Sequence, residues 1–386
     1  MEEYDVAVVG AGPAGSSAAR AAAAAGARVV VLDRAAFPRY KTCGGGLIGP
    51  SLAALPGRPP VRASITRVSL SLAGRRRRTR TVGEPCLQMV TRAELDEWLL
   101  QQAADAGAEV RVPCRVLSVS DDVVRTSDGP LRAQVVVAAD GTSSRLARDV
   151  GVRLAHVDLG LELELDAGPV AGEWTDRVHL DWGPIPGSYA WVFPKGDTLT
   201  VGVIAARGAG EATRRYLRDF VRWVGLERLR VLHDSGHLTR CRTPDSPLGR
   251  GRVLLAGDAA GLLEPWTREG ISFATRSGAL AGAVAAGGPA GAVERYRAAL
   301  SADVLPEMAA GERCLRAFEH RPWAFHELIR STSVGWQQFA RITRGETTLA
   351  RALRRRPVRA GLSLLTPGSA KPASPRTWTT GSHSLV

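Results

Sequence analysis

The stretch from Tyr4 to Arg34 constrains the fold of this 386-residue chain more than any other. It reads YDVAVVGAGPAGSSAARAAAAAGARVVVLDR, with apolar runs at 6–9 and 29–32 and an alanine-rich run at 14–25 between them. Apolar runs of this length predict buried parallel strands, and the alanine-rich run predicts a helix that connects them. A β-turn-α-β unit of this kind is typical of doubly wound sheets. We therefore expect an α/β fold that begins with a Rossmann-like domain.

The turn after the first strand carries the pattern G-x-G-x-x-G in Gly10, Gly12 and Gly15. Gly10 permits a tight turn, Gly12 lets the backbone approach a pyrophosphate, and Gly15 lets helix and strand pack closely. The helix N-terminus presents free N–H groups and a positive dipole end to the phosphates. Asp33, which ends the second strand, can accept hydrogen bonds from a ribose hydroxyl. The turn predicts a site for NAD or FAD, although a glycine-rich turn in an ordinary α/β domain shares part of the pattern.

Charge and cysteine content restrict the class of protein. The formal net charge is +13, and only three of the 51 basic residues are lysine. This arginine excess accompanies abundant alanine and glycine, as in a coding bias, and no zinc-finger, helix-turn-helix or RRM pattern supports nucleic-acid binding. The five cysteines form no CxxC pair and no metal-ligand spacing, so we expect a reducing cytoplasm and no metal. We expect neither a signal peptide nor a membrane-spanning helix, because the acidic N-terminus leads directly into a core strand and no run of about 18 uncharged apolar residues occurs.

A second glycine-rich stretch, FPRYKTCGGGL, occupies residues 37–47. Its three consecutive glycines let a chain pass close to a flat or bulky group. Cys43 directly precedes these glycines, and Lys41 lies two residues before it. Two interpretations stay open on these residues alone: a loop that passes a bound group, and a flexible loop whose thiol has no role.

Two later segments repeat the pattern of a strand followed by a turn with an acid. The apolar runs at 133–139 and 253–256 end in Asp140-Gly141 and Gly257-Asp258. A helix with small residues is predicted over 268–286, and its first turn can offer backbone N–H groups to an anion or to an electron-rich ring oxygen.

An earlier helix is predicted from Thr91, which forms a capping box with Glu94. Arg92 lies in the first turn, where a cation is poorly placed for the helix dipole. This misfit indicates either an anionic neighbour or an exposed side chain.

Strands dominate the middle of the chain. Strands at 64–72 and 79–82 flank the run Arg75–Arg78, which we expect to form a solvated hairpin tip, with an anionic partner as the alternative. Between 159 and 165 apolar residues alternate with Gly160, Glu162 and Glu164, which predicts a half-buried strand.

The stretch PGSYAWVFP at 186–194 predicts a strand with Tyr189, Trp191 and Phe193 on one face. Three aromatic rings on one face form either a flat apolar wall beside a pocket for a ring or a hydrocarbon chain, or part of an aromatic core.

The domain organisation follows from these segments. We expect a discontinuous dinucleotide-binding domain at 1–60, 84–155 and 245–300, with a β-sheet substrate domain inserted at 61–83 and 156–244. An arginine-rich helical region is expected at 301–365. The proline-, serine- and threonine-rich tail at 366–386 is expected to be disordered.

Four of these motifs together resemble the flavoprotein superfamily of the p-hydroxybenzoate hydroxylase type. They are GAGPAG, the helix that carries Arg92, ADG at 139–141 and AGDAAG at 256–261. In that superfamily the four segments surround one extended FAD, so the resemblance implies FAD as the cofactor. Asp33 is expected at the adenosine ribose, Arg92 at the phosphates and Asp258 at the ribityl-pyrophosphate region. The full set of residues implied for FAD is Gly10, Gly12, Ala14, Gly15, Asp33, Arg34, Gly44, Gly45, Arg92, Val116, Asp140, Gly141, Gly257, Asp258, Gly270 and Ile271.

Within the superfamily the chain is similar to the geranylgeranyl reductase family. Two signatures carry this similarity: the loop RYKTCGGGL, and the motif P-x-x-Y-x-W-x-F-P, which is matched in full at 186–194. The segment before the last FAD helix often reads Thr-Gly-Glu-Gly in that family, but here it is Thr267-Arg268-Glu269-Gly270. Trp266 also stands where a smaller aliphatic residue is usual.

The resemblance implies a reductase that hydrogenates carbon–carbon double bonds of an isoprenoid chain, with NADPH, NADH or ferredoxin as the electron donor. The substrate classes are a menaquinone side chain, geranylgeranyl diphosphate and a prenylated lipid. Cys43, Tyr189 and Trp191 are the expected catalytic residues, and Tyr189, Trp191 and Phe193 are expected to bind the substrate. We expect peripheral contact of the basic C-terminal helices with the inner face of a membrane.

Two alternatives remain open from the sequence. The first is an FAD-dependent monooxygenase that hydroxylates an aromatic or polyketide substrate, because it shares the fold and most of the FAD motifs. The second is a lipid-binding protein that holds FAD without catalysis. The sequence does not indicate an oligomeric state.

Overall fold

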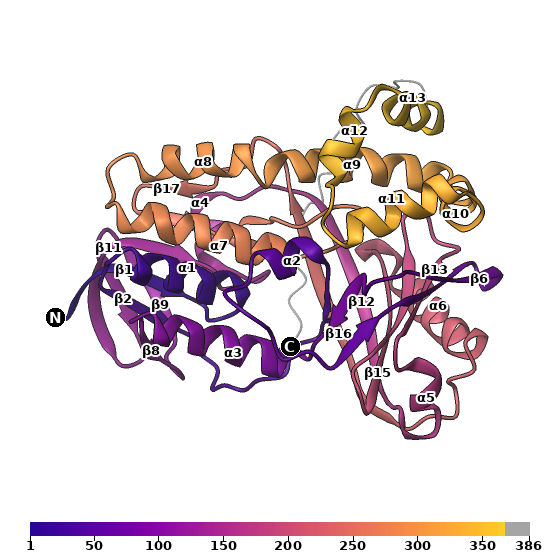
Figure 1. The fold of residues 1–386 in the computed structure, drawn as a ribbon. Helices are drawn as coiled ribbons and strands as arrows, with labels where there is room; N and C mark the ends of the chain where they lie inside the picture. The colour runs from indigo at the N-terminus through magenta and orange to yellow at the C-terminus, as the bar shows by residue number, and fades with distance from the viewer. Residues whose placement is uncertain (367–386) are drawn as a thin grey trace, which may run out of the picture.

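The two apolar runs of the opening stretch pair in parallel within an eight-stranded sheet (Figure 1). The structure is a computed structural model and describes residues 1–366. The strand order is β17-β18-β11-β1-β2-β8, and the four pairings from β18 to β8 are parallel, as continuous apolar runs predict. Strands β9 and β10 extend β11 as an antiparallel ribbon. The strands are β1 (Glu3–Val9), β2 (Val29–Leu32), β8 (Glu109–Arg111), β9 (Val116–Ser120), β10 (Val123–Thr126), β11 (Gly129–Ala138), β17 (Gly249–Arg250) and β18 (Val253–Leu255).

Helices with small residues cover this sheet. Helix α1 packs so closely on α7 that a Cβ on Gly278 or Gly282 would lie 2.0 Å from the carbonyl oxygen of Ala14 or Ala18. The alanine-rich sequence therefore serves close helix contact as well as helix propensity. The helices on this part of the chain are α1 (Pro13–Ala24), α3 (Arg92–Asp105), α4 (Arg145–Val150), η3 (Gly257–Ala260), α7 (Ile271–Ala286) and α8 (Ala292–Ala302).

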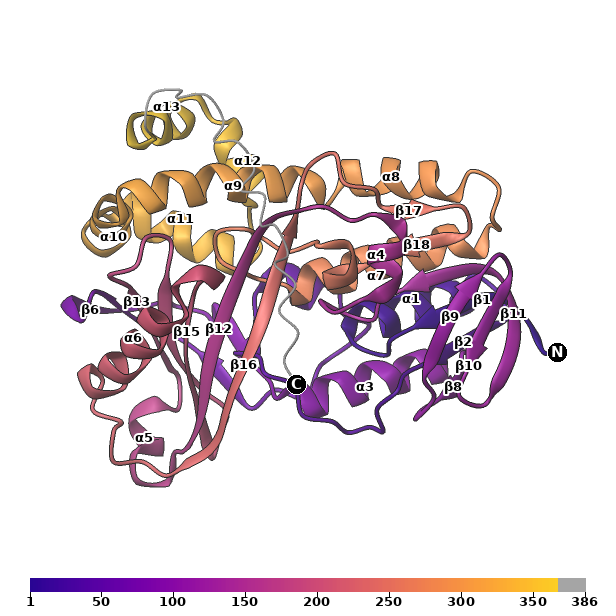
Figure 2. The ribbon, with the colours of Figure 1, turned by 180° about the vertical axis from the view of Figure 1, so that it is seen from behind.

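A second sheet of seven strands has the order β16-β12-β15-β14-β13-β5-β6. All of its pairings are antiparallel except the one between β13 and β5. Figure 2 shows the two longest strands, β12 and β16, running side by side. The strands are β5 (Arg67–Leu72), β6 (Arg75–Thr81), β12 (Leu154–Asp166), β13 (Arg177–Trp182), β14 (Tyr189–Pro194), β15 (Thr198–Ala206) and β16 (Val231–Arg242).

Smaller elements complete this part of the chain. A three-stranded antiparallel sheet and five short or peripheral helical segments connect to the two large sheets. They are β3 (Gly46–Leu47), β4 (Ala63–Ile65), β7 (Leu87–Met89), α2 (Gly49–Ala53), η1 (Gly168–Val170), α5 (Ala171–Trp174), η2 (Arg207–Ala209) and α6 (Gly210–Trp223).

The seven-stranded sheet buries both faces near its centre. One face packs its aliphatic residues against α6 and α5, in a core that includes Leu161, Val192 and Val203. The other face carries Glu162 and Trp191, which are 2% and 7% exposed. The alternation at 159–165 correctly predicted a strand, but the expected solvent on its polar face was wrong for Glu162, because the loop at 39–45 lies across that face.

The four consecutive arginines do not form a hairpin tip. They belong to strand β6, and the turn that joins β5 and β6 lies at Ala73-Gly74. The four side chains are exposed, and Arg76 forms an ion pair with Glu327 on α10. The run is therefore part of the sheet edge beside the C-terminal helices.

The C-terminal region is helical, as predicted, and packs above the second sheet (Figure 1). None of the described helices is both long and apolar enough to span a bilayer. The predicted disordered tail falls outside the described residues except for Thr366, and the predicted domain boundaries remain predictions. The helices are α9 (Leu305–His320), α10 (Pro322–Ser331), α11 (Ser333–Thr343), α12 (Leu349–Arg354) and α13 (Arg356–Leu365).

Candidate active site

The glycine-rich turn after β1 has the tight backbone that its sequence predicts. Gly10 has φ +99°, and a Cβ there would lie 2.4 Å from the carbonyl oxygen of Ala139. A Cβ on Gly15 would lie 1.7 Å from the carbonyl oxygen of Gly10, so helix α1 contacts the turn directly. Gly12 is the N-cap of α1 and supplies no side-chain cap, which leaves N–H groups of the first turn available. This cradle fits the pyrophosphate of a dinucleotide.

Asp33 stabilises the same turn. Its two carboxylate oxygens accept hydrogen bonds from the backbone N–H groups of Ala11 and Ala35, at 2.8 and 2.9 Å. Each oxygen keeps a second acceptor position, so contact with a ribose hydroxyl stays compatible with the geometry. The backbone N–H of Cys114 donates to the carbonyl oxygen of Asp33, which places the start of β9, with Val116, beside Asp33 and Arg34.

The two later turns meet the first at one edge of the sheet, because β1, β11 and β18 are parallel and end together. Asp140 follows β11, and its Oδ1 is buried without a hydrogen-bond partner among the described residues. Burial raises the pKa of this carboxyl. An unpartnered buried acceptor at this edge fits a bound group with hydroxyls. Gly141, the next residue, has φ +78°.

The first turn of α7 lies beside the second acid of this edge. Gly270 is the N-cap of α7 and provides no side-chain cap, and a Cβ on Gly270 would lie 3.9 Å from Asp258 Oδ1. Gly257 packs against Ala14 of α1 and donates its N–H to Ser277 Oγ at 2.9 Å. The residues implied for the ring end of FAD, Gly270 and Ile271, thus stand next to Asp258. Together with the pyrophosphate cradle, these turns form a continuous row that fits an extended FAD.

The glycine-rich loop at 39–45 is fixed at several points, so the interpretation as a flexible loop is wrong. The Cys43 N–H donates to Glu162 Oε1 at 3.1 Å, and Lys195 Nζ donates to the Cys43 carbonyl oxygen at 3.0 Å. Lys41 Nζ lies 3.1 Å from His237 Nε2. These partners come from β12, from the end of β14 and from β16, so the loop crosses the face of the second sheet.

The glycines of this loop make close approaches that no larger residue permits. Gly45 has φ +71°, and a Cβ there would lie 2.1 Å from the Val90 carbonyl oxygen. A Cβ on Gly44 would lie 2.9 Å from the ring of Phe193 and 3.3 Å from Trp191 Nε1. The loop therefore packs directly on the aromatic strand.

The three aromatic rings of β14 form one continuous wall. The ring centroids of Tyr189 and Trp191 are 5.7 Å apart, and those of Trp191 and Phe193 are 6.2 Å apart. The opposite face of β14 belongs to the aliphatic core against α6. The wall thus faces the glycine loop and the segment before α7. Tyr189 and Phe193 also pack against a second hydrophobic cluster, which includes Trp182 and Phe318. Trp191 Nε1 is buried without an acceptor among the described residues.

The anionic neighbour expected for Arg92 in the first turn of α3 is Asp96 on the same helix. The Nε and Nη2 atoms of Arg92 both donate to the Asp96 carboxylate at 2.7 Å, and Arg39 Nη2 approaches it at 2.9 Å. Asp96 is fully buried. Burial alone would lower the pKa of Arg92, but the paired carboxylate raises it. The spacing of Arg92 and Asp96 along α3 is the signal that could have revealed this pair; contact of Arg92 with FAD phosphates remains a prediction.

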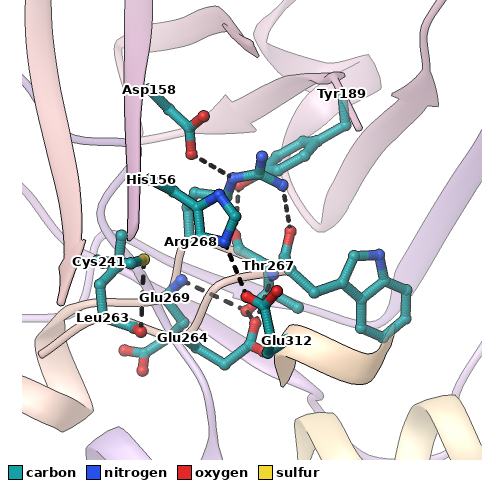
Figure 3. A network of polar contacts seen from close by, with 11 residues as sticks. His156, Asp158, Tyr189, Cys241, Leu263, Glu264, Thr267, Arg268, Glu269 and Glu312 are labelled. Carbon is teal, nitrogen blue, oxygen red and sulfur yellow. Dashed lines mark hydrogen bonds and ion pairs between the residues drawn. The ribbon is translucent and has the colours of Figure 1, made fainter. Parts of the chain in front are cut away.

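A polar network holds the segment that departs from the family pattern, as Figure 3 shows. Arg268 has φ +56°, is 4% exposed at its side chain, and donates to Asp158 Oδ2 at 3.0 Å and to the Trp266 carbonyl oxygen at 2.7 Å. The Tyr189 hydroxyl donates to the Thr267 carbonyl oxygen. Sequence reasoning missed Asp158, because nothing in β12 alone indicates its partner.

The same network reaches the C-terminal helices. Glu264 accepts hydrogen bonds from the N–H and hydroxyl of Thr267, and His156 Nε2 lies 2.8 Å from Glu312 Oε2 on α9 (Figure 3). Trp266 packs on Phe318 and Phe325, which explains why a large ring is accommodated at this position. The network thereby fixes the conformation of the segment that leads into the first turn of α7.

Comparisons with known proteins agree with this geometry. A family profile described as "FAD dependent oxidoreductase" matches residues 5–87. Digeranylgeranylglycerophospholipid reductase 1 of Methanopyrus kandleri is 34% identical over 311 residues, which cover 73% of this chain and 80% of that protein. Geranylgeranyl diphosphate reductase of Rhodobacter capsulatus is 31% identical, over 72% of this chain and 73% of that protein.

Solved structures share the fold. A geranylgeranyl bacteriochlorophyll reductase-like protein of Thermoplasma acidophilum has a TM-score of 0.74 at 22% identity and covers 92% of this chain and 99% of its own. A flavin-dependent brominase has a TM-score of 0.72 at 17% identity and covers 94% and 98%. At these identities the structural likeness shows the fold alone.

Proposed function

Because the chain belongs to the geranylgeranyl reductase family of FAD-dependent oxidoreductases, we propose that it hydrogenates carbon–carbon double bonds of an isoprenoid chain. The substrate classes are a menaquinone side chain, geranylgeranyl diphosphate and a prenylated lipid. The electron donor is NADPH, NADH or ferredoxin.

The observation that carries this proposal is the position of the aromatic wall. Tyr189, Trp191 and Phe193 line up on one face of β14, across from the glycine loop and beside the segment that leads into α7. A flat apolar wall binds a hydrocarbon chain through burial of apolar surface, without requiring hydrogen bonds from the ligand. The wall therefore suits a prenyl chain at the ring end of the FAD site.

The chemistry requires a hydride and a proton on opposite ends of the double bond. FAD supplies the hydride when it is bound and reduced. The protein must hold the chain against the aromatic wall, exclude water and provide the proton. Cys43 sits on the loop that packs on the wall, so we keep Cys43, Tyr189 and Trp191 as the proposed catalytic residues.

An anaerobic assay tests the function. The FAD-loaded protein is reduced with dithionite and mixed with menaquinone, geranylgeranyl diphosphate or a digeranylgeranyl glycerolipid, and flavin absorbance and product mass are followed. We expect flavin reoxidation and a gain of two mass units per reduced double bond. Reduced flavin that ignores all three lipids, but in air adds an oxygen atom to an aromatic compound, would replace this proposal with the monooxygenase.

Replacing Cys43 with alanine is expected to lower turnover about tenfold while FAD stays bound, because Cys43 lies on the loop that packs on the aromatic wall. Cys43 is the only half-buried cysteine among the five, and the others are buried. Turnover and flavin absorbance of Cys43→Ala are compared with those of Cys314→Ala, whose thiol lies in the core between α9 and α12. Equal turnover in the two variants would remove Cys43 from the mechanism.

We also propose that the C-terminal helices contact the inner face of a membrane, where an isoprenoid lipid resides. Exposed apolar side chains on α10, α11 and α13, such as Trp323 (55% exposed), Val334 (69%) and Leu364 (80%), accompany a cluster of exposed arginines. Basic residues beside apolar ones suit the surface of an anionic bilayer. The exposed arginines of the cluster are Arg351, Arg354, Arg355, Arg356 and Arg359.

Changing four of these arginines to glutamine is expected to weaken binding to anionic liposomes at least tenfold, because each contributes about 1 kcal/mol near a charged surface. The variant combines Arg354, Arg355, Arg356 and Arg359, all of which are exposed. The matched control changes four exposed arginines of α6, namely Arg214, Arg215, Arg218 and Arg222. Sedimentation with liposomes measures both, and equal loss in the two variants would contradict a specific membrane surface.

A further inference from the structure

Glu162 occupies the row of the second sheet that contains the middle ring of the aromatic wall. Across the strands this row runs Trp191, Gly202, Glu162 and Ser235. Gly202 has no side chain, and the Trp191 ring fills the space above it, since a Cβ on Gly202 would lie 2.1 Å from Trp191 Cζ2. Because alternate residues of a strand share a face and neighbouring strands lie about 4.8 Å apart, the indole extends over Gly202 toward Glu162.

Glu162 is buried, and only one of its two carboxyl oxygens accepts a hydrogen bond from the described residues. The residue is 2% exposed, and its Oε1 accepts the Cys43 N–H at 3.1 Å. This is the one hydrogen bond that its carboxyl group makes with the described residues, so Oε2 accepts none from them. The neighbouring Trp191 Nε1 is likewise buried without an acceptor in the described part of the chain. Glu162 Oε2 and Trp191 Nε1, two polar groups in one row beside the wall, thus have no hydrogen-bond partner among the described residues.

The charges around Glu162 come from every element that packs on this face. Lys195 is buried and lies 3.9 Å from Glu164 Oε1, so two carboxylates on one strand face share a single lysine. Burial is the main cause that raises the pKa of Glu162, to about 7, and Glu164 adds to it. Lys195, the Cys43 N–H and Arg92 oppose this rise. The other charged or titratable groups that pack on this face include Arg39, Tyr40, Lys41 and Cys43 on the loop, His233 and His237 on β16, and the Arg92–Asp96 pair on α3.

We propose that Glu162 is the acid that provides the substrate proton in the reduction proposed above, on which this inference rests. One alkene carbon receives the hydride from reduced flavin, the π bond breaks, and the other carbon forms its C–H bond with the proton of the neutral Glu162 carboxyl. The alkene gains two electrons and the flavin loses two. Glu162 is left as a carboxylate and regains a proton from water, while the flavin is reduced again by a nicotinamide or an iron–sulfur donor.

The isosteric change Glu162→Gln keeps an acceptor for the Cys43 N–H but removes the proton. In single-turnover reoxidation of reduced flavin by a prenyl lipid, we expect the rate of the variant to be lower than that of the wild type by a factor of about 100 or more. The wild-type rate should fall as the pH rises above about 7, because the neutral carboxyl is the active form, and this dependence should vanish in the variant. The matched control is Glu164→Gln, which changes the next residue on the same face of β12. It should keep the rate measured at low pH and keep a pH dependence, with a midpoint below that of the wild type, because the Glu164 charge helps to raise the pKa of Glu162.

Infrared difference spectra provide a readout that needs no turnover. Across a pH titration of the FAD-loaded protein, the carbonyl stretch of a neutral carboxylic acid should disappear with a midpoint near pH 7 in the wild type and at a lower pH in Glu164→Gln. It should be missing from Glu162→Gln. Other buried carboxyls, such as those of Asp140 and Glu264, absorb in the same region, so the difference between wild type and variant identifies the group.

The two readouts separate the inference from the function on which it rests. Wild-type spectra without a titrating acid near pH 7, or an unchanged single-turnover rate in Glu162→Gln, would overturn the assignment of Glu162 and leave the reductase function standing. A titrating Glu162 in a protein whose reduced flavin ignores every prenyl lipid would overturn the function and, with it, the transfer of this proton to an alkene. Where the glutamine variant does not fold, a wild-type spectrum and a wild-type rate that both lack a transition near pH 7 still overturn the assignment of Glu162.

Discussion

Gly12→Ala is expected to yield a folded protein that no longer retains FAD, with the affinity lowered at least about 100-fold, or ~2.7 kcal/mol. The backbone of Gly12 has φ −74° and ψ −175°, which alanine adopts without strain, and a Cβ there would meet only Arg39 Nη2, at 3.5 Å. The added methyl therefore fits the protein alone. It projects from the N-cap of α1, where the pyrophosphate must approach the backbone.

The matched glycine variants distinguish the cofactor site from the fold. Gly15→Ala should lose both stability and FAD, because its Cβ would lie 1.7 Å from the Gly10 carbonyl oxygen and the turn must move. Gly208→Ala should change neither, since no atom lies within 4 Å of its Cβ position. Flavin absorbance after purification and calorimetric titration of the FAD-free protein measure affinity, and circular dichroism measures folding. Full FAD retention by Gly12→Ala would place the pyrophosphate elsewhere.

Asp96→Asn is expected to lower the stability of the protein by about 3–5 kcal/mol. Asp96 is fully buried and is the carboxylate partner of both Arg92 and Arg39. Its neutral replacement leaves the buried Arg92 guanidinium without a counter-charge, and removal of one partner of a buried ion pair is far more costly than removal of an exposed one. The thermal midpoint should fall by roughly 4–6 °C.

The control for this variant is Asp122→Asn, whose pair with Arg132 is about half exposed and should change the midpoint by no more than about 1 °C. Added FAD tests the expected contact between Arg92 and the phosphates. If that contact exists, FAD should raise the midpoint of Asp96→Asn by more than that of the wild type, because the phosphates replace the missing negative charge. Equal shifts would argue against contact between Arg92 and the phosphates.

The sequence correctly predicted those features that depend on interactions between residues close together in the chain. The turn at Gly10–Gly15 needs positive φ and missing side chains, and only glycine provides both. The capping box of α3 was also predicted, and Thr91 Oγ1 accepts the Glu94 N–H. The aromatic residues of β14 share one face because the period of a strand is two. Each of these features depends on residues within a few positions of one another.

Contacts between distant segments could not be predicted in this way. The Arg75–Arg78 run was expected at a hairpin tip, but the structure places the turn at Ala73-Gly74 and the arginines in β6, because pairing with β5 continues through them. The alternation around Glu162 was expected to face solvent, but the glycine loop covers it.

The sequence by itself therefore determined the dinucleotide turn and the aromatic strand, because backbone conformation and strand period are properties of neighbouring residues. Only the tertiary structure decided that Arg39 joins the Arg92–Asp96 pair, that Asp158 pairs with Arg268, and that Glu162 is buried beside the aromatic wall. Burial and the approach of charges from other strands set the protonation of a carboxyl, and these depend on which segments the fold brings together.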